Sequence, residues 1–173
     1  MRVLGIDPGP NGFAWAIYDS EKSDIVEWGD DAASKSDYVV IEDIQSYGNM
    51  IGKSTLDTAK TIGKIQGWYP EALLLPRKAI AQVLGGSVRA GDKAINYALG
   101  KLIPSFSYKR RGLNGHHRAA AACAYVGYGR IKSQEILKNA ILPLGLSPTK
   151  TRQVPKSPML GESADHLRRT QGG

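Results

Sequence analysis

The chain has 173 residues, of which 42% are hydrophobic, and a formal net charge of +7. It is long enough to bury one hydrophobic core, and none of its apolar runs approaches the ~18 residues of a membrane span. The positive charge favours a polyanionic partner, either a nucleic acid or an anionic membrane surface. Met1-Arg2 leads directly into a strand pattern, so we expect no secretory signal. The single Cys123, in an alanine-rich run, predicts a core residue in a reducing compartment such as the cytoplasm.

In chain order, the hydrophobic pattern predicts strands first and then alternating helices and strands. The predicted strands are residues 3–7, 12–18, 25–28, 38–42 and 72–75. The predicted helices are 55–65 with Ser54 as N-cap, 76–84 ended by Gly85-Gly86, 90–102 ended by Pro104, and 116–128. Short polar connections make the second and third strands hairpin partners of the first, which predicts an α/β domain with a mixed sheet over residues 1–142. The prolines and basic residues of 143–173 predict a tail without its own core.

Two of the predicted strands end in a carboxylate. Asp7 closes the first strand before Pro8-Gly9, and Glu42 closes the strand of residues 38–42. Asp7 alone is equally consistent with a turn aspartate, but a glutamate at the end of a buried strand is costly unless it is paired or bound to metal. Strand alternation turns Asp43 to the opposite face, at the surface or behind the ligands. Two such carboxylates predict an acidic site of the kind that holds hard cations such as Mg²⁺.

Two of the three histidines, His116 and His117, open the alanine-rich helix. Either side chain could simply cap the helix or face solvent. A neutral imidazole suits this position better than a charged one, because the helix dipole is positive at the N-terminus. It would serve there as a metal ligand or as a proton carrier.

Five segments, in their order and spacing, carry a family resemblance. They are Leu4-Gly5-Ile6-Asp7-Pro8-Gly9, Val40-Ile41-Glu42, Ser46-Tyr47-Gly48-Asn49-Met50 with Gly52-Lys53, Arg77-Lys78 followed by Leu84 to Leu99, and Gly112 to Ala122. Together they resemble RuvC-type Holliday junction resolvases of the RNase H-like superfamily, in particular the bacteriophage members. The resemblance implies a mixed five-stranded sheet flanked by helices and a metal-dependent endonuclease that resolves four-way and branched DNA junctions. It also implies a homodimer that does not bind a membrane. The expected location is the cytoplasm, which is the host cytoplasm if the protein is phage-encoded.

The resemblance also implies a catalytic site of Asp7, Glu42 and His116 holding two Mg²⁺ or Mn²⁺ ions, with Asp43 and His117 in minor roles. The family usually has aspartates where this chain has His116 and Ala119, although some members have histidine at the first position. Imidazole binds transition metals better than it binds Mg²⁺. We therefore hypothesise a preference for Mn²⁺ or a general-base role of the imidazole. A carboxylate replaced to give an inactive protein is the alternative.

DNA binding is expected from basic residues outside the metal site. The candidates are Lys53, Lys60, Lys64, Arg77, Lys78, Arg89, Lys93, Lys109, Arg110 and Arg111. Phosphate contacts of this kind make affinity fall steeply with salt. Tyr47 could stack on an unpaired base at the branch point or pack locally. The face of the first helix with Leu56, Ala59, Ile62 and Ile65 is a dimer candidate by resemblance, and equally a core face.

Three other functions remain open at this stage. One is another RNase H-like nuclease, acting on RNA–DNA hybrids or flaps. A second is a junction-binding protein with impaired catalysis, because His116 and Ala119 replace carboxylates. A third is an ATPase of the actin-like superfold. That fold has two lobes, and the chain is too short to form both.

Overall fold

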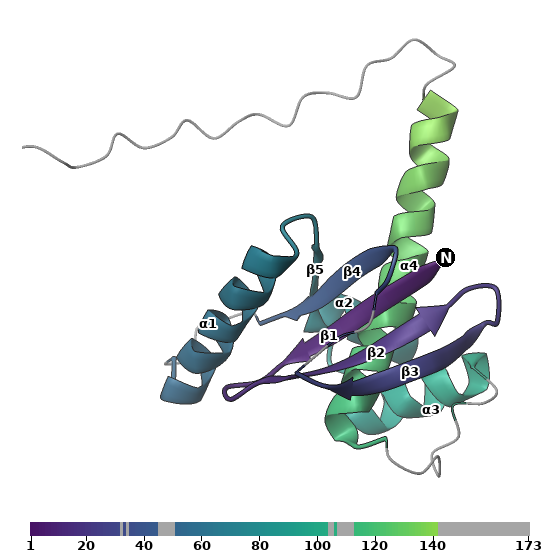
Figure 1. Ribbon diagram of the computed structural model, residues 1–173. Coiled ribbons are helices and arrows are strands. Elements are labelled where there is room, and N and C mark those ends of the chain that lie inside the picture. The colour runs from purple at the N-terminus through teal and green to yellow at the C-terminus, as the bar shows by residue number, and fades with distance from the viewer. Residues whose placement is uncertain (32, 34, 45–50, 104–105, 107–112, 142–173) are drawn as a thin grey trace, which may run out of the picture. The chain divides into compact units, whose positions relative to one another are not determined.

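The structure is a computed structural model that describes residues 1–31, 33, 35–44, 51–103, 106 and 113–141. Within these residues, five strands form one sheet in the order β3-β2-β1-β4-β5 (Figure 1). β1 (Arg2–Pro8), β2 (Phe13–Asp19) and β3 (Asp24–Asp30) are antiparallel neighbours. β4 (Tyr38–Asp43) and β5 (Leu73–Pro76) run parallel to β1. The predicted mixed five-stranded sheet is confirmed.

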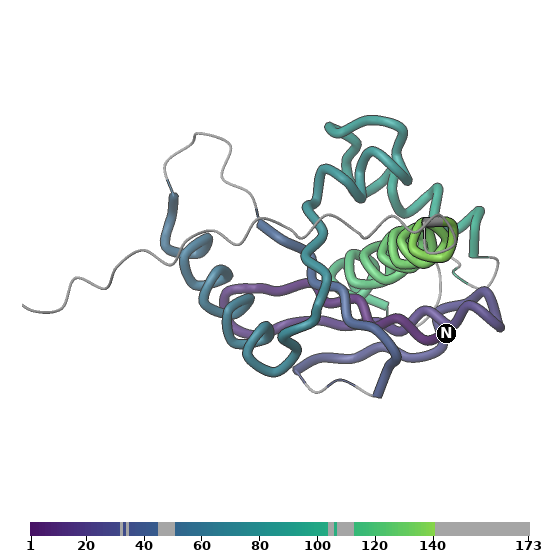
Figure 2. Tube along the Cα trace, turned by 90° about the horizontal axis from the view of Figure 1, so that it is seen from above, coloured from purple at the N-terminus to yellow at the C-terminus, as the bar shows by residue number. Residues whose placement is uncertain are grey.

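Four helices flank the sheet: α1 (Lys53–Trp68), α2 (Arg77–Gly85), α3 (Asp92–Leu102) and α4 (Gly115–Ile141). α1 packs on one face, and α2, α3 and α4 gather on the other (Figures 1 and 2). None of the described helices is both long enough and apolar enough to cross a bilayer.

The strands separate two hydrophobic clusters because their side chains alternate between the faces. On β1, Leu4 and Ile6 point toward α1 and join Ile62 and Ile65 of that helix in one cluster. The alternate residues of β1 face α4, and Val3 among them joins the larger cluster with the alanines of that helix. Asp7 continues this second set and therefore faces the start of α4.

Close contact between β1 and α4 fixes the position of that helix. A Cβ on Gly5 would lie 2.2 Å from the carbonyl oxygen of Ala120 and 2.4 Å from the amide nitrogen of Ala124. Ala120, Ala124 and Cys123 are completely buried, as the alanine-rich pattern predicted. Small residues on both sides therefore bring the start of α4 against the end of β1.

The helix boundaries differ from the prediction by one to three residues at most ends, and by more at the end of α4. α1 begins at Lys53 with Gly52 as its N-cap, so the predicted N-cap Ser54 was wrong. α3 begins at Asp92, because the extended Gly91 precedes it. α4 continues thirteen residues past the predicted end at Tyr128, since good helix formers follow Gly127 and Gly129. Termination of α2 at Gly85-Gly86 is confirmed, and Gly86 has the left-handed φ of 72° that favours glycine.

The face of α1 that was a dimer candidate divides between two environments. Ile62 and Ile65 are buried in the core, whereas Leu56 and Ala59 are exposed. The chain divides into two compact units, Met1–Leu137 and Lys138–Gly173, with only the end of α4 described in the second. The predicted domain boundary after residue 142 stays a prediction.

Candidate active site

The two predicted catalytic carboxylates lie side by side at the ends of adjacent strands. Ile6 of β1 is registered with Ile41 of β4, so Asp7 and Glu42 occupy the next position on two parallel strands. Neighbouring strands are about 4.8 Å apart. The side chains of Asp7 and Glu42 are only 15% and 13% exposed, respectively. Residues 35 positions apart in sequence thus form one half-enclosed acidic site.

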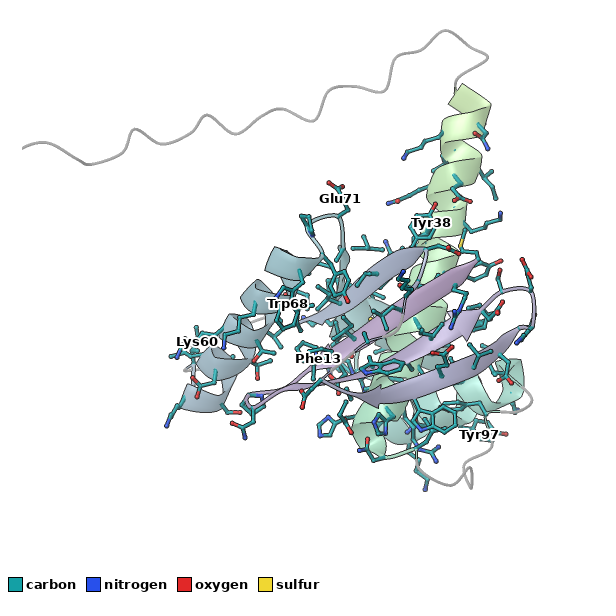
Figure 3. The ribbon with its side chains drawn as sticks, viewed as in Figure 1. Phe13, Tyr38, Lys60, Trp68, Glu71 and Tyr97 are labelled. Carbon is teal, nitrogen blue, oxygen red and sulfur yellow. The ribbon has the colours of Figure 1, made fainter. Side chains whose placement is uncertain are left out.

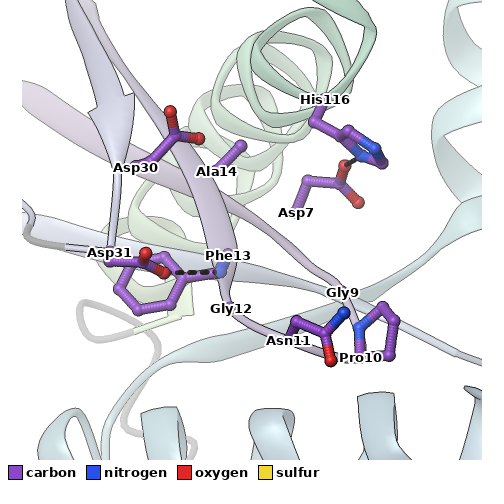
Figure 4. A pocket seen from close by; sticks show the side chains of 10 residues that line it. All are labelled: Asp7, Gly9, Pro10, Asn11, Gly12, Phe13, Ala14, Asp30, Asp31 and His116. Atoms are coloured by element: carbon purple, nitrogen blue, oxygen red, sulfur yellow. Dashed lines mark hydrogen bonds and ion pairs between the residues drawn. The ribbon is translucent and has the colours of Figure 1, made fainter.

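His116, at the start of α4, closes this site from the helix side. Its Nδ1 lies 2.8 Å from Oδ2 of Asp7 (Figure 4). An ionised Asp7 only accepts hydrogen bonds, so with Asp7 ionised Nδ1 donates in this contact and Nε2 of a neutral ring keeps its lone pair. The imidazole is 76% exposed. A basic ring nitrogen is therefore presented to solvent beside a carboxylate.

His117 holds the helix end in place. Its backbone N–H donates to Oδ1 of Asn114 at 2.9 Å, and the Asn114 N–H donates to Nδ1 of His117 at 3.3 Å. This reciprocal pair is a capping box in which histidine takes the place usually held by Glu or Gln. Nε2 of His117 lies 3.2 Å from Oδ1 of Asp30 on β3, a close contact without hydrogen-bond alignment. The buried His117 is thus a structural residue that orients the turn carrying His116.

Arg77, at the start of α2, links Glu42 to α3. Its Nη1 lies 3.5 Å from Oε2 of Glu42, and its other terminal nitrogen pairs with Asp92. Arg77 is partly buried and stands among negative groups. It supplies the positive charge nearest to Glu42 among the described residues.

Burial makes both carboxylates reluctant to ionise. Burial raises the pKa of Glu42 to about 7, with repulsion from Asp7 adding to the rise and Arg77 opposing it. Burial also raises the pKa of Asp7, while the hydrogen bond from His116 lowers it. Two adjacent acids whose charged forms are disfavoured would gain from a bound cation.

A depression of about 260 Å³ opens next to Asp7 and His116. The turn between β1 and β2 forms its floor, and Asp30 and Asp31 stand on its far side (Figure 4). Oδ1 of Asp31 accepts a hydrogen bond from the Phe13 N–H at 3.1 Å, which ties the end of β3 to this turn. Asp7 and His116 are therefore reachable from solvent through this depression.

The donor chemistry of the site suits a divalent cation, but three ligands are not gathered. Asp7 and Glu42 offer hard oxygen donors of the kind Mg²⁺ and Mn²⁺ take. Among the described residues, no group of three or more His, Cys, Asp or Glu side chains lies close enough to hold a metal. Arg77 pairs with Glu42, and His116 bonds to Asp7. Asp7 and Glu42 are therefore the two oxygen ligands that the described residues of this site offer to a cation.

The remaining predicted site residues have varied positions. Asp43 is partly buried on β4, next to Glu42. Lys60 pairs with Asp57 on α1 at 2.9 Å. The predicted DNA-binding residues that are exposed in the structure are Lys53, Lys60, Lys64, Lys78, Arg89 and Lys93. Tyr47, Lys109, Arg110 and Arg111 lie outside the described residues.

The sequence prediction missed several partners of the site. The spacing of Asn114 and His117 is that of a capping box and was a usable signal. The pairing of Arg77 with Glu42 and Asp92 had no local signal, because three separate elements bring these residues together.

Comparison with solved structures identifies the fold. T. thermophilus RuvC in complex with a Holliday junction substrate matches with a TM-score of 0.58 and 15% identity, over 76% of this chain and 96% of that chain. The chain has a RuvC-like fold. A second Thermus thermophilus RuvC structure matches with a TM-score of 0.58 and 14% identity, over 76% of this chain and 97% of that chain. No family model and no curated protein matches the sequence. At this identity the likeness to RuvC shows the fold alone.

Proposed function

We propose that the protein is a structure-selective endodeoxyribonuclease that hydrolyses phosphodiester bonds at four-way and branched DNA junctions with a divalent cation. One observation carries this proposal: Asp7 and Glu42 are neighbours on parallel strands of a RuvC-like fold, with His116 bonded to Asp7. The net charge of +7 suits a nucleic-acid substrate. A RuvC of the same fold was solved with a Holliday junction substrate.

Asp7 and Glu42 are the residues proposed to hold Mg²⁺ or Mn²⁺, with two ions per site as the family resemblance implies. When bound, such a cation stabilises negative charge on a phosphoryl group and lowers the pKa of a bound water. The protein's own part is to hold both carboxylates in one rigid, half-buried position at the ends of two strands. Their mutual repulsion favours binding of positive charge.

His116 has two roles that fit its geometry. With Nδ1 on Asp7, its Nε2 is oriented toward solvent and would take a proton from an attacking water. The same orientation suits a metal ligand whose second nitrogen is bonded to a carboxylate. In both roles the contact with Asp7 orients the ring. Substitutions at His116 distinguish proton transfer from metal binding by their effect on the metal preference of cleavage.

The homodimer and the relation to bacteriophage members are part of the proposal. A four-way junction has two-fold symmetry, and symmetric incision is simplest with a two-fold dimer. The exposed part of α1, with Leu56 and Ala59, is available for such a contact. The bacteriophage assignment depends on the motifs of the sequence.

A cleavage assay on synthetic DNA tests the proposed function. Labelled four-way junction, flap, linear duplex and RNA–DNA hybrid are incubated with the full chain in Mg²⁺, Mn²⁺ or EDTA. We expect metal-dependent incision of the four-way junction and its loss in Asp7→Asn and Glu42→Gln, with Glu71→Gln, at an exposed acidic residue outside the site, as the control. Preferential cleavage of the hybrid or the flap would assign another RNase H-like nuclease activity instead.

A junction-binding protein without catalysis is the second candidate. It is favoured by the pairing of Arg77 with Glu42 and by the missing third ligand among the described residues. Tight junction binding without incision in both Mg²⁺ and Mn²⁺ would establish this second function.

A further inference from the structure

α3 presents a basic face with an aromatic ring at its centre. Lys93, Tyr97 and Lys101 follow one another at intervals of four residues, so they lie on the same side of the helix. All three are exposed, Tyr97 to 65%, and Nζ of Lys101 lies 4.5 Å from the centre of the tyrosine ring. Figure 3 shows Tyr97 on α3, at the end of the fold opposite to α1. Ile95 and Leu99 anchor the other side of α3 in the core.

This face carries no negative charge of its own helix. The only acidic residue of α3 is Asp92, and it pairs with Arg77. An open depression of about 600 Å³ lies at the start of the face, lined by Gly91, Lys93, Ala94 and Tyr97. The ammonium group of Lys101 lies over the Tyr97 ring, and Lys93 is one turn away on the same side of the helix. Proteins that bind single strands combine exposed aromatic rings, on which bases stack, with basic groups that contact the phosphates.

The face is connected to the candidate active site by ion pairs. Glu42 contacts Arg77, Arg77 contacts Asp92, and Lys93 is the next residue of α3. A strand whose phosphate lay at Glu42 would therefore reach α3 after a short distance. The Cα atoms of Lys93 and Lys101 are about 12 Å apart along the helix, a length over which a nucleic-acid strand places more than one phosphate.

We propose that Lys93, Tyr97 and Lys101 form a single-strand-binding face that holds an unpaired base of a branched DNA on the tyrosine ring and its flanking phosphates on the two lysines. The inference rests on the proposed junction nuclease activity and adds two residues, Tyr97 and Lys101, and a ligand class. DNA is favoured over a protein partner by charge complementarity, because the charged side chains of this face, Lys93 and Lys101, are both positive.

Fluorescence anisotropy with a labelled four-way junction in EDTA tests this face, since cleavage does not occur there. The full chain is titrated at 50 to 200 mM salt as wild type, Lys93→Gln/Lys101→Gln, Tyr97→Ala and Tyr97→Phe. The double lysine variant should lower the slope of log affinity against log salt by about 1.5 to 2, and Tyr97→Ala should weaken binding about fivefold or more. Tyr97→Phe should bind like the wild type because the ring remains.

The control Lys22→Gln/Lys35→Gln removes two exposed lysines elsewhere and matches the change in net charge. If the two double lysine variants have the same junction affinity and the same salt slope, the α3 proposal is overturned and the nuclease proposal is left intact. Wild type that fails to bind the junction at 50 mM salt would refute junction recognition itself. Variants that bind DNA normally but change the oligomeric state would assign the face to a protein partner and overturn the inference.

Discussion

Replacing Glu42 by glutamine should stabilise the cation-free protein at neutral and alkaline pH. Burial raises the pKa of Glu42 to about 7, from a usual value of 4.5, despite the nearby Arg77. The folded protein therefore retains a proton that the unfolded chain loses as the pH rises between these two values. A difference of about 2.5 in pKa makes folding less favourable by about 3 kcal/mol once both states are ionised.

The sign of this effect sets the pH window of the test. Well below pH 4.5 the carboxyl group is protonated in both states, so wild type and Glu42→Gln should unfold with nearly equal free energy there, and the difference should still be small at pH 4.5. As the pH rises toward 7 the wild type should lose stability relative to the variant. Above pH 7 the difference should level off at about 3 kcal/mol in favour of Glu42→Gln.

Urea unfolding followed by tryptophan fluorescence in EDTA at pH 4.5 and pH 8 measures this difference. Asp43→Asn removes a carboxylate from the adjacent residue of β4 and controls for net charge. Adding Mn²⁺ at pH 8 should stabilise the wild type more than Glu42→Gln. If the variant is no more stable than the wild type at pH 8, Glu42 is not an energetically costly buried acid and the reasoning is refuted.

Four further predictions test the surroundings of the site. Gly5→Ala should destabilise the fold by about 1–3 kcal/mol and reduce cleavage, because the new methyl group meets the α4 backbone. The control Gly63→Ala on α1, whose methyl group meets open space, should be neutral or stabilising. Thermal melts and cleavage rates measure both effects. His117→Ala should cost about 1 kcal/mol of unfolding free energy and lower the cleavage rate, with recovery in His117→Gln, and equal rates in both variants would argue against a positioning role. His116→Asp should shift the metal preference of cleavage from Mn²⁺ toward Mg²⁺, whereas loss of activity in both metals would assign the imidazole to proton transfer. Arg77→Gln should move the pH midpoint of the Glu42 effect upward, because Arg77 lowers that pKa; an unchanged midpoint in the urea series would contradict the contact.

The sequence was sufficient to place the two strands that carry the carboxylates. Asp7 and Glu42 each follow an apolar run, and strand periodicity is a local property that the sequence records directly. The close packing of α4 on the sheet was also predictable, because a run of alanines both favours a helix and permits close approach.

The contacts around these carboxylates could not be predicted, since they depend on how separate elements meet. Arg77 was predicted as a DNA-binding residue, and its ion pairs with Glu42 and Asp92 had no signal in the sequence, because they form where the start of α2 meets two other elements. The bond between His116 and Asp7 joins residues 109 positions apart, and only the packing of α4 against Gly5 brings them together. The sequence placed Asp7 and Glu42 at two strand ends, and the structure shows that these strands are parallel neighbours. The catalytic roles of the two residues stay predictions.

Isothermal titration of the full chain with Mn²⁺ and Mg²⁺ at pH 8 tests most directly whether Asp7 and Glu42 share a cation. The wild type and Glu71→Gln, a control at an exposed acidic residue outside the site, should bind with similar affinity. Asp7→Asn and Glu42→Gln should each weaken binding at least about tenfold, as expected when an oxygen ligand is removed. Equal metal affinity in all four proteins would contradict the proposal that these two carboxylates form the catalytic metal site.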